Sequence, residues 1–268
     1  MGRVISFVSG KGGVGKSVMC AGIGSALAEM NKSVCLIDFD FGLNNLDLML
    51  NLEQKVVYDI TDFLSGKTRL RQTLIADEHK DNLYFLSSAK VNLFEDLDPS
   101  LVKDVVDRIA GVFDYVLIDS PAGISQASRF IIEQFSEVVL VTTPNISSIR
   151  DAGNIARIIF NLNKTPKLIV NKLRPEMIDK HKSLSEIEIG RMLNLSLLGV
   201  FHEIDDISTY SSIKGVYECS VDGRDEFKGL ATNLANNRAY NESISINKRH
   251  NKIRKLLDVF KWGKYESV

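Results

Sequence analysis

The sequence is poor in the residues that stabilise small secreted proteins or bind structural metals. Its only three cysteines, Cys20, Cys35 and Cys219, are far apart among 268 residues. An odd number of widely spaced cysteines argues against a disulfide framework and indicates reduced, mostly buried thiols in a cytosolic protein. The four histidines lack the spacing of metal ligands, so we expect no structural metal.

Long hydrophobic runs are lacking as well. The longest, such as residues 138–141, fall far short of the roughly 20 residues that span a bilayer. A strand is expected to begin almost at Met1, which leaves no place for a signal peptide. With 44% hydrophobic and 25% charged residues, the composition is ordinary for a globular protein. The length suits one large α/β domain.

The most informative stretch is the glycine-rich segment 9–17, which separates an apolar strand-like run (4–8) from a helix-compatible run (18–30). It matches the phosphate-binding pattern G-x-x-x-x-G-K-[ST]. Glycines allow successive backbone N–H groups to curl round a polyphosphate, and the following helix adds its positive end. Lys16 should reach the β- and γ-phosphates, and the Ser17 hydroxyl should bind Mg²⁺. The residues expected to contact the nucleotide here are Gly10, Lys11, Gly12, Gly13, Val14, Gly15, Lys16, Ser17 and Val18.

Lys11 is an additional cation within this loop, and on spacing alone it could be a solvated surface lysine. Residues 11–17 resemble the deviant Walker A motif of the ParA/MinD ATPases. The resemblance implies that Lys11 crosses the interface of an ATP-sandwiched homodimer and acts in catalysis together with Lys16. Residues 147–151 resemble a segment of the same family, which implies that Asp151 meets the lysine of the partner's loop.

Two acids follow the second expected strand, residues 33–38. Ligands of open parallel sheets lie at the carboxyl ends of the strands, so Asp38 and Asp40 should face the phosphates. There they could hold a Mg²⁺-bound water or orient the attacking water, although helix caps or ordinary loop acids have the same pattern. Residues 38–47 resemble the switch I segment of the family's MinD branch. This implies that Asp40 is the catalytic acid and that Asp38 lies beside Mg²⁺, while Asn44 departs from the usual arginine.

Further along, residues 115–119 form an apolar run that ends in Asp119, the arrangement of a Walker B motif that binds Mg²⁺. Residues 119–123 resemble the family's switch II. The strand-like run 168–172 places Asn171 where it could contact adenine. The guanine motif N-K-x-D is absent because Arg174 occupies its last position, which favours ATP.

Strand-like and helix-like segments alternate along the chain, which predicts a doubly wound, mainly parallel α/β sheet of the P-loop NTPase type. By resemblance this is the SIMIBI class. We expect a P-loop ATPase domain at residues 1–239, a polar linker at 240–250 and an amphipathic membrane-targeting helix at 251–264.

The C-terminal segment combines an apolar stripe with basic flanks. Ile253, Leu256, Leu257 and Phe260 recur at helical spacing, and Trp262 follows. Residues 248–264 carry seven Lys/Arg and one acid, whereas the rest of the chain has 26 basic and 33 acidic residues. Such a helix fits the interface of an anionic membrane. It could instead dock on its own domain or on a partner. A single short helix binds a membrane weakly. An ATP-dependent dimer would carry two such helices, and their avidity would couple ATP binding to membrane attachment.

The family resemblance runs from the first strand to this tail, because MinD proteins end in a similar helix. It implies a slow, partner- or membrane-stimulated ATPase of the cytoplasm and inner membrane face. Such a protein helps to place the division site by recruiting a MinC-like septation inhibitor, and it is activated by a MinE-like or other regulator. No specific nucleic-acid partner is expected. The alternatives are a ParA-type DNA partition ATPase, a flagellar-number regulator and a nucleotide-gated scaffold with little hydrolysis.

Overall fold

The computed structural model describes residues 1–41, 46–88, 94–204, 216 and 219–240. One eight-stranded sheet has the order β3-β4-β2-β5-β1-β6-β7-β8. Every neighbouring pair is parallel except β3 and β4, so the predicted doubly wound, mainly parallel fold is confirmed. The strands are β1 (Arg3–Val8), β2 (Val34–Asp38), β3 (Leu74–Ala76), β4 (Leu83–Leu86), β5 (Tyr115–Asp119), β6 (Glu137–Thr142), β7 (Lys167–Leu173) and β8 (Leu197–His202).

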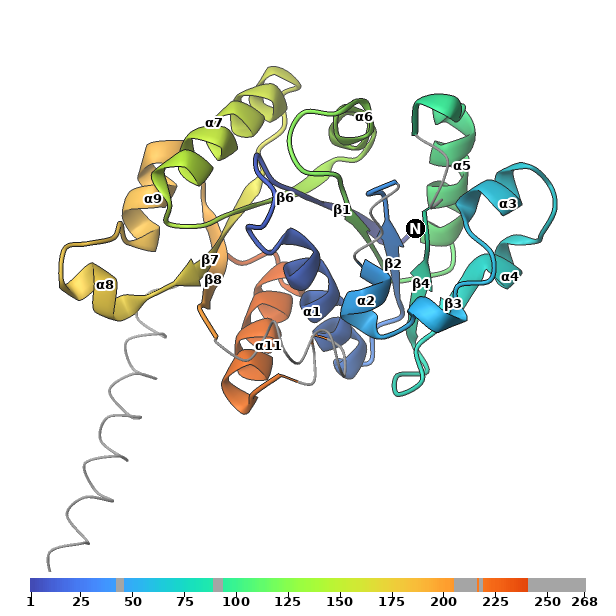
Figure 1. Ribbon diagram of the computed structural model, residues 1–268, viewed down its shortest axis with the longest axis horizontal. Helices are drawn as coiled ribbons and strands as arrows, with labels where there is room; N and C mark the ends of the chain where they lie inside the picture. The colour runs from blue at the N-terminus through green and yellow to red at the C-terminus, as the bar shows by residue number, and fades with distance from the viewer. Residues whose placement is uncertain (42–45, 89–93, 205–215, 217–218, 241–268) are drawn as a thin grey trace, which may run out of the picture.

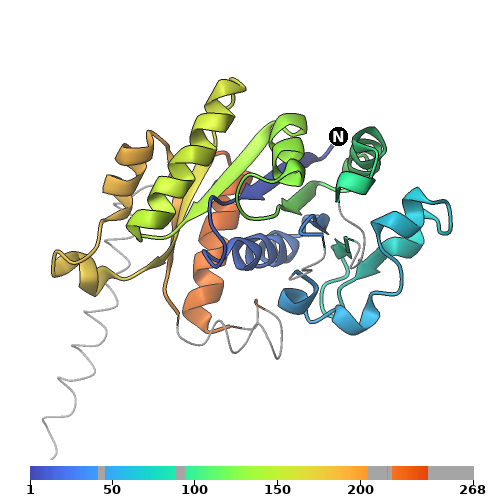
Figure 2. The same ribbon diagram turned by 45° about the horizontal axis from the view of Figure 1, so that its top comes forward.

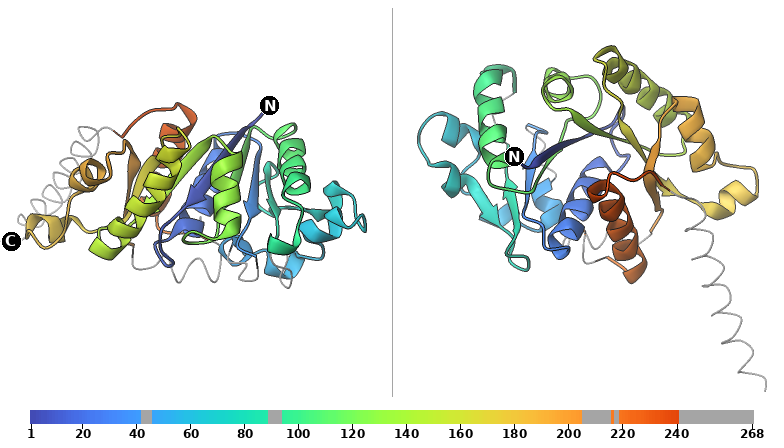
Figure 3. Two further views of the ribbon diagram at one scale, coloured as in Figure 1. Left: turned by 90° about the horizontal axis from the view of Figure 1, so that it is seen from above. Right: turned by 180° about the vertical axis from the view of Figure 1, so that it is seen from behind.

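Helices cover both faces of this sheet. In Figures 1 and 3, α5, α6, α7 and α9 lie on one face, and α1 and α11 lie on the other. Short 3-10 turns occur at Glu53–Lys55 and Phe94–Asp96. The helices are α1 (Lys16–Glu29), α2 (Leu46–Leu50), α3 (Ile60–Leu64), α4 (Leu70–Thr73), α5 (Pro99–Ala110), α6 (Gln126–Gln134), α7 (Ile146–Asn161), α8 (Pro175–Asp179), α9 (Glu186–Leu193) and α11 (Val221–Ala235).

The central elements are buried on all sides. Every residue of β2 and β5 is buried, as expected for parallel strands covered by helices on both faces. Eleven of the fourteen residues of α1 are also buried, so this helix is interior rather than amphipathic. It packs against the sheet and is flanked by α2 on one side and by α11 on the other (Figures 1 and 2). The loop that precedes α1 is therefore held by a rigid core.

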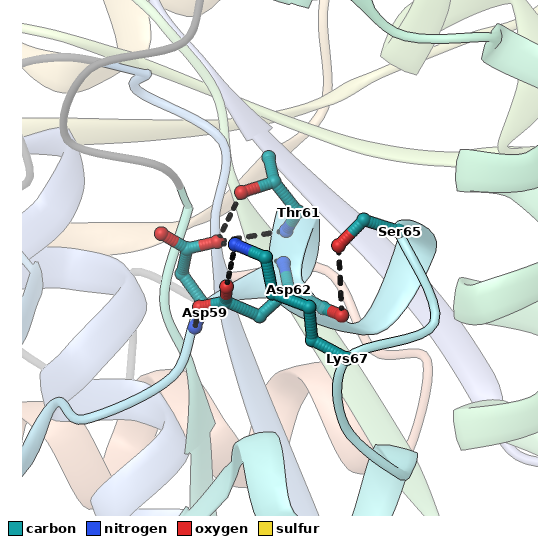
Figure 4. Close-up of polar contacts among 5 residues, drawn as sticks. All are labelled: Asp59, Thr61, Asp62, Ser65 and Lys67. Carbon is teal, nitrogen blue, oxygen red and sulfur yellow. Dashed lines mark hydrogen bonds and ion pairs between the residues drawn. The ribbon is translucent and has the colours of Figure 1, made fainter.

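Local capping sets the start of α3. The Asp59 carboxylate accepts hydrogen bonds from Thr61 N at 2.8 Å and Asp62 N at 3.3 Å, and Asp62 accepts one from Asp59 N at 3.2 Å (Figure 4). This reciprocal capping box satisfies N–H groups that have no partner inside the helix. Lys67 adds an ion pair to Asp62 at 3.0 Å. The short helix α3 begins at this cap.

Several elements were not predicted, and α11 is the largest of them. It packs on α1 and completes the second helical layer. The last described residue, Tyr240, donates a backbone hydrogen bond to Leu197 O at 2.8 Å and so joins the end of the domain to β8. The predicted amphipathic helix, and the linker after Tyr240, lie outside the described residues. Within the described part of the chain, no helix is long and apolar enough to cross a membrane.

The amino end of β1 is tightly enclosed. Gly2 N donates to Ala110 O at 2.6 Å, and a Cβ added at Gly2 would lie 1.9 Å from Phe113 O. Met1 itself is 88% exposed. Met1 therefore lies at the amino ends of the parallel strands, opposite to their carboxyl ends.

Candidate functional site

The glycine loop joins the carboxyl end of β1 to α1, as predicted. Gly13 and Gly15 adopt φ angles of 77° and 87°, in the left-handed region that disfavours residues with a Cβ. Gly15 is the N-cap of α1, and no side chain caps the helix there. A Cβ at Gly15 would also lie 2.2 Å from Asn171 Nδ2, so close packing requires glycine as well.

A buried ion pair connects the loop to β5. Lys16 Nζ lies 2.5 Å from Asp119 Oδ1, and the two side chains are 6% and 1% exposed. The pair forms because β1 and β5 are neighbours, with Phe7 in register with Asp119. The other carboxylate oxygen, Asp119 Oδ2, is buried and has no hydrogen-bond partner among the residues that the structure describes. The structure thus brings the two predicted Walker residues together and leaves one buried oxygen available to a ligand.

Asp38 adds a second carboxyl group beside this pair, because it is in register with Asp119 on the adjacent strand. Its Oδ1 accepts from Asp40 N at 2.8 Å and its Oδ2 from Leu46 N at 3.1 Å. Burial and the neighbouring Asp119 charge raise the pKa of Asp38 from its usual value to about 7, against the opposing effect of these two N–H groups and of Lys16. Asp38 can therefore change protonation state near neutral pH.

This raised pKa leads to a stability prediction. Between about pH 4, where an unfolded aspartate titrates, and about pH 7, the folded protein retains the Asp38 proton that the unfolded chain releases. Stability should therefore fall as pH rises through this window. Asp38→Asn should remove that slope. Urea unfolding of both proteins without nucleotide at pH 5, 6, 7 and 8 measures the difference. Parallel profiles would contradict the prediction.

Asp40 is half-buried just beyond the end of β2. Burial raises the pKa of its carboxyl group, and the nearby Lys16 charge acts in the opposite direction. Asp40 therefore lies close enough to Lys16 for the two charges to interact. Ser17 and Val18 lie at the start of α1, and Val18 packs against the core. The catalytic, metal-binding and phosphate roles of these three residues stay predictions, and Asn44 lies outside the described residues.

Lys11 is exposed, and its Nζ contacts Ser147 Oγ at 3.1 Å. Asp151 lies one helical turn further along α7, with its side chain 27% exposed and its Oδ1 3.4 Å from Arg150 Nε. The loop packs closely against this turn, since a Cβ at Gly10 would lie 2.3 Å from Asp151 O. Lys11 and Asp151 therefore share one face of the molecule, while their predicted contacts across a dimer are untested.

The side-chain amide of Asn171 is hydrogen-bonded to protein groups, one of them in the glycine loop. Its Nδ2 donates to Val14 O at 2.7 Å, and its Oδ1 accepts from Lys172 N at 2.8 Å. Its predicted contact with adenine remains untested. The cavity has a volume of about 450 Å³, and its lining includes Gly12, Lys172 and Glu203. Sequence reasoning missed Lys172 and Glu203 as residues of this cavity, although the predicted strand 168–172 contains Lys172.

These features define a class of protein. A doubly wound sheet with a glycine loop after β1, whose lysine pairs with an acid at the end of β5, is the architecture of a P-loop nucleotide-binding protein. Residues 5–214 match the family described as the CobQ/CobB/MinD/ParA nucleotide binding domain. The chain belongs to this family of nucleotide-binding ATPases, within the MinD/ParA group, and the resemblance inferred from the sequence is confirmed.

Individual relatives point to one branch of the family. The chain is 38% identical over 213 residues to a putative septum site-determining protein MinD of Emiliania huxleyi, covering 79% of this chain and 78% of that protein. The MinC:MinD cell division complex of Aquifex aeolicus contains a similar chain (TM-score 0.79, 33% identity, 87% and 96% covered). MinD of Pyrococcus horikoshii complexed with Mg-ADP is similar too (TM-score 0.77, 26% identity, 87% and 96% covered).

Proposed function

We propose that this protein binds and hydrolyses ATP with Mg²⁺ at the carboxyl edge of its sheet. The observation that carries the proposal is the buried pair of Lys16 and Asp119 at the glycine loop, in which Asp119 Oδ2 has no partner within the described part of the chain. Lys16 would exchange this contact for the β- and γ-phosphates, to which the loop offers its N–H groups. Asp40 would orient the attacking water.

The residues at this edge fit Mg²⁺, which prefers hard oxygen ligands and keeps several of its waters. The unpartnered carboxylate oxygen of Asp119 and the hydroxyl of Ser17 would hold the ion, and Asp38 would bind its waters. Once bound, Mg²⁺ would neutralise charge on the phosphates. The relative that was solved with Mg-ADP supports a magnesium nucleotide as the ligand.

Adenine is the base that we propose for the nucleotide. Recognition of guanine by an N-K-x-D motif needs a carboxylate where this chain has Arg174. In the structure the Arg174 guanidinium is ion-paired with Glu203 at the rim of the cavity. Asn171 would complete the base site if its amide turned away from Val14 O.

We further propose that ATP links two copies through the face that carries Lys11 and Asp151. Lys11 is exposed there, and among the described residues its Nζ is bonded to the Ser147 hydroxyl, so it is available to a partner's phosphates. The dimer would pair two C-terminal tails and so strengthen attachment to the inner face of the cell membrane. By analogy with the MinC:MinD complex, the dimer would recruit a MinC-like septation inhibitor from the cytoplasm. A MinE-like or other regulator would stimulate hydrolysis.

The membrane part of this proposal predicts a large effect of Leu257→Glu. Each buried leucine contributes roughly 1.5–3 kcal/mol, so removing one and adding a charge should weaken liposome binding more than about tenfold. ATP-dependent dimerisation in solution should survive. Ser267→Glu adds the same charge after the stripe and is the matched control. Co-sedimentation with anionic liposomes and light scattering, each with ATP and with ADP, measure both properties.

Repeating the co-sedimentation with DNA in place of liposomes tests the main alternative. A DNA partition ATPase would show ATP-dependent binding to DNA and little affinity for the liposomes. Liposome binding that is equal in the Leu257→Glu and Ser267→Glu proteins would show that the apolar stripe does not insert, and the membrane proposal would fail.

A further inference from the structure

The end of β7 has an irregularity next to the glycine loop. Val170 pairs with Val200 and Leu173 with His202, so β7 contains one more residue than β8 over this stretch and forms a β-bulge. Lys172 lies in the bulge with a φ of 56°, in the left-handed region that is costly for a residue with a Cβ. Bulges near functional sites re-aim side chains.

The bulge aims two donors at two consecutive carbonyl groups of the loop. Lys172 Nζ donates to Gly13 O at 3.2 Å. Asn171 Nδ2 donates to Val14 O at 2.7 Å, and the amide is held in this orientation by Lys172 N. The two segments are almost 160 residues apart in the chain, at separations of 159 and 157. Both contacts are made while the backbone at Lys172 is left-handed.

These carbonyl groups matter because the N–H group of the same peptide points the opposite way and can bind the phosphates. A phosphate-binding loop presents its N–H groups to the anion, so its carbonyl oxygens must point away and find donors elsewhere. The peptide that carries Gly13 O also carries the N–H of Val14. A donor on the oxygen polarises the peptide and strengthens that N–H as a donor.

We propose that Lys172 is a positioning residue for polyphosphate binding, which acts by holding the Gly13 carbonyl group away from the phosphates. The inference rests on the proposed ATP site. Lys172 is exposed and lines the cavity of about 450 Å³, so its removal leaves no buried charge behind. It acts on the loop backbone, and hence on any ligand with a phosphate chain, independently of the base.

The test compares Lys172→Met, which keeps the length of the side chain but loses the donor, with Lys172→Arg, which restores a donor. Fluorescent MgADP binding and its displacement by magnesium pyrophosphate are measured for each protein. We expect Lys172→Met to weaken both ligands about threefold to tenfold, the range of one exposed hydrogen bond, and Lys172→Arg to recover to within about twofold. The melting temperature without nucleotide should be unchanged. Lys182→Met, which removes a charge from the lining of the same cavity, is the control and should match the wild type.

Each other result overturns the inference. Weaker MgADP binding with unchanged pyrophosphate binding would assign Lys172 to the base. Equal weakening by Lys182→Met would indicate general attraction by positive charge, and a lowered melting temperature with unchanged binding would indicate a purely structural contact. If the wild-type protein itself binds no MgADP, the proposed function fails first. If it binds MgADP and Lys172→Met binds equally well, only the inference fails.

Discussion

Replacing Lys16 with alanine is expected to abolish nucleotide binding and also to destabilise the protein without nucleotide. The first effect follows from loss of the ammonium group that would contact the β- and γ-phosphates. The second follows from burial, because Asp119 would remain in the core without its 2.5 Å partner. Removing one member of a buried ion pair typically costs about 3–5 kcal/mol. The loss of stability should therefore be measurable before any ligand is added.

Urea unfolding and fluorescent ATP binding separate these two effects. In the double variant Lys16→Ala/Asp119→Asn no buried charge remains at the pair, so stability should largely return while ATP binding stays lost. An additive double variant, as unstable as the two single changes predict, would show that the ion pair does not carry the energy. ATP binding by Lys16→Ala within a few-fold of the wild type would remove Lys16 from the phosphate site.

Asp40→Asn is expected to slow ATP hydrolysis by about 100-fold or more while leaving ATP binding nearly intact. A side chain that orients or deprotonates water contributes typically 10²–10⁴-fold to a rate. Asparagine keeps the size of Asp40 but cannot accept a proton. Since ATP is proposed to link the two copies, a variant that consumes ATP slowly should accumulate as an ATP dimer. Phosphate release and light scattering with ATP measure the two properties.

Asp81→Asn is a suitable control for this change. Asp81 is exposed near the amino end of β4, at the opposite edge of the sheet from the loop. The Asp81→Asn protein should hydrolyse ATP at the wild-type rate and should not accumulate as a dimer. Equal rates in the Asp40→Asn and Asp81→Asn proteins would exclude Asp40 from the chemistry.

The parallel strands could be predicted from the sequence because each is a short apolar run bounded by polar residues. β5 was predicted at its observed bounds, since its apolar residues end in Asp119. α11 was missed because two glycines, Gly223 and Gly229, and two aspartates, Asp222 and Asp225, lower its local helix propensity. Packing of Phe227 and Leu230 into the core cluster that includes α1 decides its conformation, and this information is not local.

In the site, too, some features could be predicted from local sequence patterns and others could not. The residues that gather at the loop, Lys16, Asp38 and Asp119, were predicted because the carboxyl ends of neighbouring parallel strands meet at one edge. Their mutual bonds were not predicted, since a motif specifies what a residue would do for a ligand and not which protein atom it contacts. The left-handed backbone of Lys172 and the contact of Asn171 with Val14 O likewise depend on a bulge that no residue pattern reveals.

The enclosed start of β1 determines where a reporter can be attached. The six residues of β1 separate the amino end from the glycine loop by about 20 Å, at roughly 3.3 Å per residue. A fluorescent protein or affinity tag fused before Met1 would therefore leave the nucleotide face accessible. Cloning scars that change the second codon are unsuitable, because any side chain at Gly2 would collide with Phe113 O.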